Sequence, residues 1–157
     1  MKRCSWRCKH PKKSHNLTMR SLGIDLGSKR VGVAVSDSSG TIASPLTVID
    51  RGMNHAQDHK KIQEIVDEYE AECLVVGMPL SLSGKVGTAA QNIQQEINEM
   101  KKFFMIPVHS HDERLTTKTA NESMIKANMK AQARRRIVDK IAAAVMLQGW
   151  LDHVDRK

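Results

Sequence analysis

Three acidic residues, Asp25, Glu113 and Asp139, stand in settings where carboxylates are uncommon. Asp25 lies inside the apolar run Leu22–Leu26, although strands are depleted in Asp and a buried carboxylate is costly unless it is paired or binds a metal. The glycines two positions away on either side would let a phosphate or a metal ion approach the backbone closely. The alternative interpretation is a turn in which Asp25 caps a hairpin.

Asp139 lies in a nearly apolar helical segment near the end of the sequence. On a helix it shares a face with Ala142, Ala143 and Met146. Small alanines let such a helix pack close to a sheet, so we expect it to carry the Asp139 carboxylate inward. The alternative is a local ion pair, because arginines stand three and four positions earlier.

Glu113 follows a predicted strand at residues 105–109, and sites in such sheets form at the carboxyl ends of parallel strands. Its neighbour Asp112 could serve the same site or cap the helix that we expect after Leu115, with two threonines as rival caps. From the pattern alone, Glu113 is equally well explained as a solvated loop acid.

Three converging carboxylates would suit a hard divalent cation such as Mg²⁺ or Mn²⁺, which prefers oxygen ligands. Two such ions about 3.5–4 Å apart can stabilise the attacking and leaving oxygens of a phosphodiester cleavage, and Asp25 would bridge them. Basic residues that could contact phosphate groups flank all three acids. They are Lys29 and Arg30 after Asp25, Arg114 after Glu113, and Arg134, Arg135 and Arg136 before Asp139. The sequence therefore predicts metal-dependent cleavage of a nucleic acid.

Zinc is an alternative with fewer features in its favour. His109 and His111 fall on one strand face with Glu113, but no cysteine is nearby and no histidine pair has helical spacing. The cysteines and histidines within residues 4–15 match no common zinc motif. Aromatic residues make up only 3% of the chain, so we expect nucleic acid to be recognised through its backbone and shape.

The elements that must position these residues follow from the hydrophobic pattern. Short apolar runs predict strands at residues 22–26, 31–35, 42–49, 73–77 and 105–109. Helical spacing predicts helices at residues 53–70, 88–102 and 133–153, besides the one after Leu115. Pro45 indicates an edge strand or a bulge. We therefore expect an α/β fold with a mixed five-stranded sheet, three antiparallel strands and then two parallel ones, flanked by helices.

Length and composition set further limits. The chain has 157 residues, 40% of them hydrophobic, which fits one compact domain. No segment approaches the roughly 20 apolar residues of a membrane span, so we expect no membrane-embedded role. The net charge of +8 is uneven. Residues 1–18 have six Lys or Arg and no acid, and residues 114–140 have eight basic and two acidic residues.

We expect residues 1–18 to be a disordered basic leader and residues 19–157 to form a single domain. One hypothesis is that Met19 is the natural start. The leader lacks the apolar core of a secretory signal, and the odd set Cys4, Cys8 and Cys73 implies no disulfide framework. Cys73 opens an apolar run and should be a buried thiol. We therefore expect a cytoplasmic protein.

Four ordered motifs make the chain similar to the YqgF/RuvX family of Holliday junction resolvase-like proteins and pre-rRNA nucleases. They are Gly23–Ala34 (GIDLGSKRVGVA), Val75–Leu80 (VVGMPL), Asp112–Thr117 (DERLTT) and Asp139–Ala143 (DKIAA). The resemblance covers Met19 to about Asp152. Ser28 stands where the family usually has Thr, and Ser81–Gly84 replaces a more polar loop, a change that affects expected substrate contacts rather than the metal site.

The resemblance implies a ribonuclease-H-like fold and catalytic, metal-binding roles for Asp25, Glu113 and Asp139. It implies action in the cytoplasm on the 5′ end of pre-16S rRNA, with cleavage of branched DNA junctions as an alternative. An inactive nucleic-acid-binding module is a second alternative. The Asp25–Ser28 segment is also similar to the first phosphate loop of actin-like ATPases, but those proteins use two such domains. Whether the protein is a monomer or a homodimer stays open.

Overall fold

The computed structural model describes residues 19–79, 87–112 and 131–154. The predictions for the leader, for the helix after Leu115 and for the loop Ser81–Gly84 lie outside these ranges.

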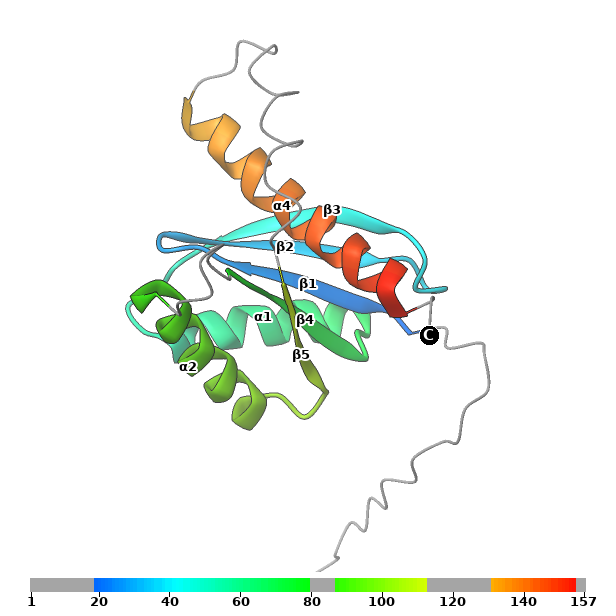
Figure 1. Ribbon diagram of the computed structural model, residues 1–157, viewed down its shortest axis with the longest axis horizontal. Coiled ribbons are helices and arrows are strands. Elements are labelled where there is room, and N and C mark those ends of the chain that lie inside the picture. The colour runs from blue at the N-terminus through cyan, green and yellow to red at the C-terminus, as the bar shows by residue number, and fades with distance from the viewer. Residues whose placement is uncertain (1–18, 80–86, 113–130, 155–157) are drawn as a thin grey trace, which may run out of the picture.

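The described residues form a five-stranded sheet with the strand order β3-β2-β1-β4-β5 (Figure 1). Its strands are β1 (Ser21–Leu26), β2 (Arg30–Ser36), β3 (Ala43–Asp50), β4 (Cys73–Met78) and β5 (Val108–Asp112). The first three are antiparallel neighbours, and β4 and β5 run parallel to β1. The predicted mixed sheet is therefore confirmed, and the carboxyl ends of β1, β4 and β5 lie at one edge.

The edge strand β3 contains Pro45, which pairs with Ala34 of β2. The pairing register shifts between Val33 and Ala34. Proline has no backbone N–H to donate to a neighbouring strand, so it is tolerated at an edge or an irregularity. Both features that Pro45 indicated are present.

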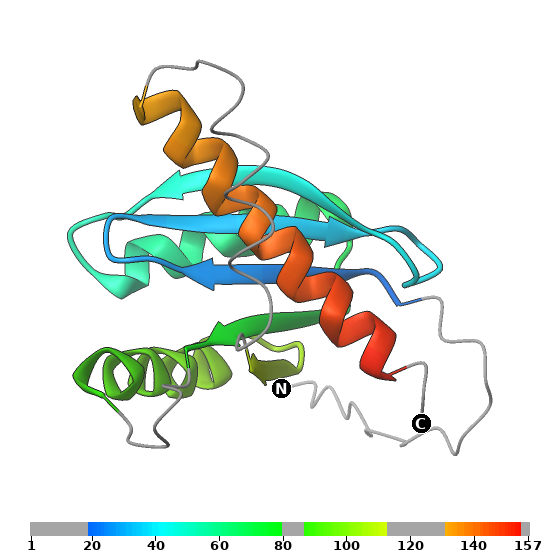
Figure 2. The same ribbon diagram turned by 45° about the horizontal axis from the view of Figure 1, so that its top comes forward.

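Helices cover the two faces of the sheet separately, as Figures 1 and 2 show. The helices α1 (His55–Tyr69) and α2 (Thr88–Phe103) lie on one face, and α4 (Ala131–Val154) crosses the other obliquely. Asn54 caps α1, because its side-chain oxygen accepts a hydrogen bond from the Gln57 N–H at 3.0 Å. All three helices agree with the predicted spans to within two residues.

Alternation along β1 decides which residues meet which helix layer. Leu22, Ile24 and Leu26 are buried in the larger core with residues of α1 and α2. Because successive strand side chains point to opposite faces, Gly23 and Asp25 face α4. A Cβ atom built on Gly23 would lie 2.7 Å from the Leu147 Cβ of α4, which confirms that orientation.

The helix α4 lies unusually close to the sheet because small residues meet on both sides of the contact. Ala143 of α4 is fully buried, as expected. On the sheet side, a Cβ atom at Gly32 would lie only 2.2 Å from the Asp139 carbonyl oxygen. The close packing therefore depends on the alanines of α4, as predicted, and also on Gly23 of β1 and Gly32 of β2, where a Cβ atom would collide with the helix.

The strand β5 begins three residues later than predicted and extends to Asp112. Met105 is 99% exposed, and Pro107 contributes only its carbonyl oxygen, which accepts a hydrogen bond from the Leu74 N–H at 2.9 Å. The apolar residues at 105–107 therefore belong to the connection from α2, and proline delays the start of the ladder. The prediction of a strand at residues 105–109 was wrong in its bounds.

Cys73 is buried as expected, and its thiol donates a hydrogen bond to the Ser21 hydroxyl at 3.2 Å. Burial raises the pKa of this thiol. Among the described residues, no helix combines the length and hydrophobicity needed to cross a membrane.

Candidate active site

Asp25 is the penultimate residue of β1, at the sheet edge where the parallel strands end. Its backbone carbonyl accepts a hydrogen bond from the Gly27 N–H at 3.2 Å, but within the described residues no group donates to its carboxylate. The side chain therefore does not cap the hairpin turn, which was the alternative interpretation of this segment. The carboxylate is left available to a ligand on the α4 face.

Asp139 reaches the same place from α4. Its backbone packs directly on Gly32, and Gly32 is the β2 residue opposite Asp25 in the antiparallel pair. The close approach of α4 to the sheet therefore brings the second predicted carboxylate toward the first. These two acids are 114 positions apart in the sequence and meet through packing of the last helix on the first hairpin.

The electrostatics of Asp25 reflect this setting. Burial, together with the negative charge of Asp139, raises the pKa of Asp25 from 3.8 to about 6. Desolvation disfavours a carboxylate, and a like charge nearby disfavours it further. Carboxyl groups with shifted pKa values are concentrated at functional sites, because a bound ligand of opposite charge offsets the desolvation and repulsion of the carboxylate.

Asp139 is paired with Arg30, whose Nε lies 2.6 Å from Oδ2 of the carboxylate. The side chains are 21% and 28% exposed, so the pair is partly shielded from water. The local pair with Arg135 or Arg136, considered from the sequence, is not the one formed. Arg136 instead pairs with Asp50 at the end of β3.

The predicted phosphate-binding residues thus divide into two groups. Arg30 and Arg136 are engaged in ion pairs with carboxylates. Lys29 and Arg135 are exposed and Arg134 is half-buried, and no ion pair joins any of them to another described residue. The second group is the better placed to contact a phosphate backbone directly.

The third predicted acid, Glu113, and its neighbour Arg114 lie outside the described residues. Asp112 is the last residue of β5 and pairs with Met78 of β4. Whether it also caps the helix expected after Leu115 stays a prediction, because that segment lies outside the described residues. Since β5 is parallel to β4, and β4 to β1, the carboxyl end of β5 lies at the edge that carries Asp25. The role of Glu113 stays a prediction.

The histidines of β5 contact the other half of α4. The His109 ring lies 5.5 Å from Trp150, and the His111 Nε2 would be 3.3 Å from a Cβ atom at Gly149. Within the described ranges, no group of three His, Cys, Asp or Glu residues could bind a metal ion. The two carboxylates near Gly32 nevertheless fit a hard divalent cation, because both would supply oxygen ligands and because burial, and then the charge of Asp139, raises the Asp25 pKa.

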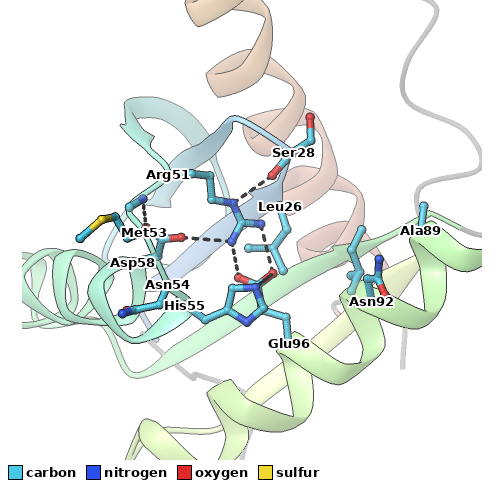
Figure 3. A pocket seen from close by; sticks show the side chains of 13 residues that line it. Leu26, Ser28, Arg51, Met53, Asn54, His55, Asp58, Ala89, Asn92 and Glu96 are labelled. Atoms are coloured by element: carbon cyan, nitrogen blue, oxygen red, sulfur yellow. Dashed lines mark hydrogen bonds and ion pairs between the residues drawn. The ribbon is translucent and has the colours of Figure 1, made fainter.

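A buried charge network, not predicted from the sequence, lies on the opposite face of the sheet. Arg51 forms ion pairs with Asp58 of α1 and Glu96 of α2 (Figure 3). It borders a cleft of about 660 Å³ between the β1–β2 turn and the first turns of both helices. One signal was available: Asp58 stands four positions before Ile62, on the apolar stripe of α1, where a charged residue is out of place.

Comparisons with known proteins agree with this arrangement. The family model described as "RuvX: Holliday junction resolvase" matches residues 19–153. A protein of Thermoanaerobacter pseudethanolicus named "Putative pre-16S rRNA nuclease" is 41% identical, covering 88% of this chain and 100% of the relative. One of the same name from Clostridium acetobutylicum is 38% identical, covering 87% of this chain and 100% of the relative.

Two structures of RuvC are among the solved structures that match. "T. thermophilus RuvC in complex with Holliday junction substrate" gives a TM-score of 0.53 at 13% identity, covering 87% of this chain and 96% of RuvC. A second Thermus thermophilus RuvC structure gives a TM-score of 0.51 at 12% identity, covering 88% and 97%. At this level of identity the similarity establishes the fold, which is ribonuclease-H-like, as the family resemblance implied.

Proposed function

The chain belongs to the RuvX family, and from this we propose that it is a metal-dependent nuclease whose substrate is the precursor of 16S rRNA. The observation that carries the proposal is the meeting of Asp25 and Asp139 at the carboxyl end of β1, where the pKa of Asp25 is raised to about 6. The names of its relatives point to pre-16S rRNA, and processing of that RNA would place the protein in the cytoplasm.

We assign Asp25, Asp139 and Glu113 as the residues that would bind one or two Mg²⁺ or Mn²⁺ ions. Such ions, when bound, neutralise phosphate charge and activate water for attack at phosphorus. Burial keeps the Asp25 carboxylate poorly solvated, which strengthens its attraction to a cation. Arg30 fixes the Asp139 carboxylate through the 2.6 Å contact, and the exposed Lys29 can bind a phosphate beside the site.

The proposal is tested by cleavage of two substrates, a pre-16S rRNA 5′-end fragment and a four-way DNA junction, with Mg²⁺ or Mn²⁺. We expect wild type to cleave the RNA and Asp25→Asn to be inactive. The control is Asp67→Asn, which makes the same chemical change on the exposed face of α1. Equal cleavage by wild type and Asp25→Asn would refute the assigned site.

The other two functions predict different results in the same assay. Cleavage of the junction but not of the RNA would favour the resolvase activity named in the family description. Salt-dependent binding without cleavage of either substrate, unchanged in Asp25→Asn, would favour an inactive binding module.

A further inference from the structure

The turn Gly27–Lys29 lies between two residues of the candidate site. Asp25 precedes the turn by two positions, and Arg30 follows it immediately. The turn is tight, since a Cβ atom at Gly27 would lie 2.5 Å from the Arg30 carbonyl oxygen. A displacement of this turn would therefore redirect both Asp25 and Arg30.

Arg51, the first residue after β3, binds the turn at both of its ends. Its backbone N–H donates to the Lys29 carbonyl at 3.1 Å, and its side-chain Nε donates to the Gly27 carbonyl at 3.0 Å. The two contacts come from different parts of one residue, so the turn is fixed relative to both the backbone and the guanidinium of Arg51.

Two buried carboxylates fix the guanidinium in turn (Figure 3). It donates to both oxygens of Glu96, at 2.6 and 3.1 Å, and to Asp58 at 3.2 Å. These acidic side chains are 4% and 2% exposed. Asp58 also accepts a hydrogen bond from the Gly52 N–H at 2.7 Å. The turn beside the active site is thus connected through Arg51 to α1 and α2.

The role of this network is better explained by the fixed positions of its hydrogen-bond donors than by a contribution to the stability of the fold. Two buried carboxylates face one guanidinium, and in such clusters the cost of desolvation offsets most of the attraction. Apolar side chains could fill the same space, since the neighbouring positions Ile62 and Ile97 belong to the core. A planar guanidinium provides what they cannot, which is a set of donors in fixed directions.

We propose that Arg51 is a positioning residue that restrains the turn Gly27–Lys29 and thereby directs Asp25 and Arg30 toward α4. Asp58 and Glu96 restrain Arg51, and none of the three touches the substrate. The catalytic part of this inference rests on the proposed nuclease function. The restraint on the turn can be measured without a substrate.

The first test is Arg51→Lys, which retains the charge but cannot bind the turn and both acids at once. We expect kcat to fall about 10- to 100-fold, as a small misplacement of catalytic groups does, with KM changed by less than about twofold. We also expect faster amide hydrogen exchange in residues 24–30. Wild-type kcat together with wild-type exchange in Arg51→Lys would overturn the proposal.

The matched control is Arg20→Lys. Arg20 also donates from its guanidinium to a backbone carbonyl, that of Tyr69 at 2.9 Å, but at the opposite end of β1. We expect this variant to leave kcat and the exchange of residues 24–30 unchanged. An equal loss of kcat in the two variants would show a general effect of stability and would also overturn the proposal.

A second set of variants separates position from stability. The single substitution Arg51→Met leaves the buried carboxylates of Asp58 and Glu96 without their guanidinium partner, so we expect a large loss of stability. The triple variant Arg51→Met, Asp58→Asn, Glu96→Gln removes all three charges, so its unfolding midpoint should return toward the wild-type value while kcat stays low. Recovery of kcat along with stability would overturn the proposal.

The two proposals fail in different ways. Failure of the nuclease assignment appears as an absence of cleavage by the wild-type protein. Failure of the positioning assignment appears as unchanged exchange of residues 24–30 in Arg51→Lys, which requires no substrate.

Discussion

Asp25 combines a buried strand position with a charge that folding disfavours. Its pKa of about 6, against 3.8 for the ordinary group, results first from burial and then from Asp139. The folded protein therefore binds a proton on Asp25 more tightly than the unfolded chain does. The favourable contribution to stability is complete below pH 3.8 and is lost as the pH rises through about 6.

The first prediction concerns Asp25→Asn without metal. A pKa rise from 3.8 to about 6 corresponds to ~3 kcal/mol, so the variant should gain up to this free energy of unfolding above pH 6 and only a small part of it near pH 4. Urea unfolding in chelator at pH 4 and pH 7.5 measures the difference. Identical pH dependence in wild type and variant would contradict the assigned burial, and Asp67→Asn should follow wild type.

The second prediction concerns metal addition. Mg²⁺ or Mn²⁺ should raise the melting temperature of wild type at pH 8, because an ion that binds only the folded state stabilises it. The shift should shrink at pH 5, where the proton on Asp25 competes with the metal. Asp25→Asn should show little shift at either pH, and a full shift in that variant would place the ion elsewhere.

At the scale of elements, the contact between α4 and the β1–β2 hairpin builds the site. We predict that Gly32→Ala displaces α4, since the new Cβ would lie 2.2 Å from the Asp139 carbonyl oxygen. Overpacking of this kind costs about 1–3 kcal/mol, and cleavage should fall with it. The control is Gly87→Ala, where nothing lies within 4 Å. Thermal unfolding and kcat check both, and unchanged kcat in Gly32→Ala would contradict the role of this contact.

The element predictions succeeded where the hydrophobic pattern was strong and failed where it was ambiguous. The alternation in β1 and the helical spacing in α4 made both elements and their buried faces predictable. The apolar residues Met105 and Ile106 resembled a strand, but periodicity cannot show that Pro107 delays the ladder or that Met105 is exposed. The partner of Asp139 was unpredictable for a similar reason, since Arg30 is 109 positions away.

At the scale of the whole molecule, charge distribution matters more than total charge. We predict that Lys29→Ala weakens nucleic-acid binding about equally for all sequences and reduces the salt slope by about one, as loss of one phosphate contact does. Lys60→Ala, exposed on α1 on the opposite face, should change neither. Binding titrations across a range of salt concentrations decide between them. An equal effect of the two substitutions would indicate non-specific attraction to the whole surface.

Whole-molecule contacts also explain why the Arg51 network escaped prediction. Its members come from the end of β3, from α1 and from α2, and the position of Asp58 on an apolar stripe does not indicate which residues it contacts. Only the tertiary arrangement makes Asp58 and Glu96 buried partners of one guanidinium. Asp25 and Asp139 were predictable because each interrupted an apolar pattern. Asp58 interrupts one too, but its pairing with Arg51, and that of Arg51 with Glu96, depends on tertiary structure that the local sequence does not show.

The packing of α4 on the first hairpin has a consequence for biosynthesis. Asp25 and Arg30 leave the ribosome more than 100 residues before Asp139, which belongs to α4. Contacts between residues so far apart in the sequence form late in folding, because closing the long intervening loop costs chain entropy before the contact can form. A nascent chain that lacks α4 therefore has an incomplete site, so the hydrolytic activity we propose would begin only after α4 has been synthesised and has packed on the hairpin.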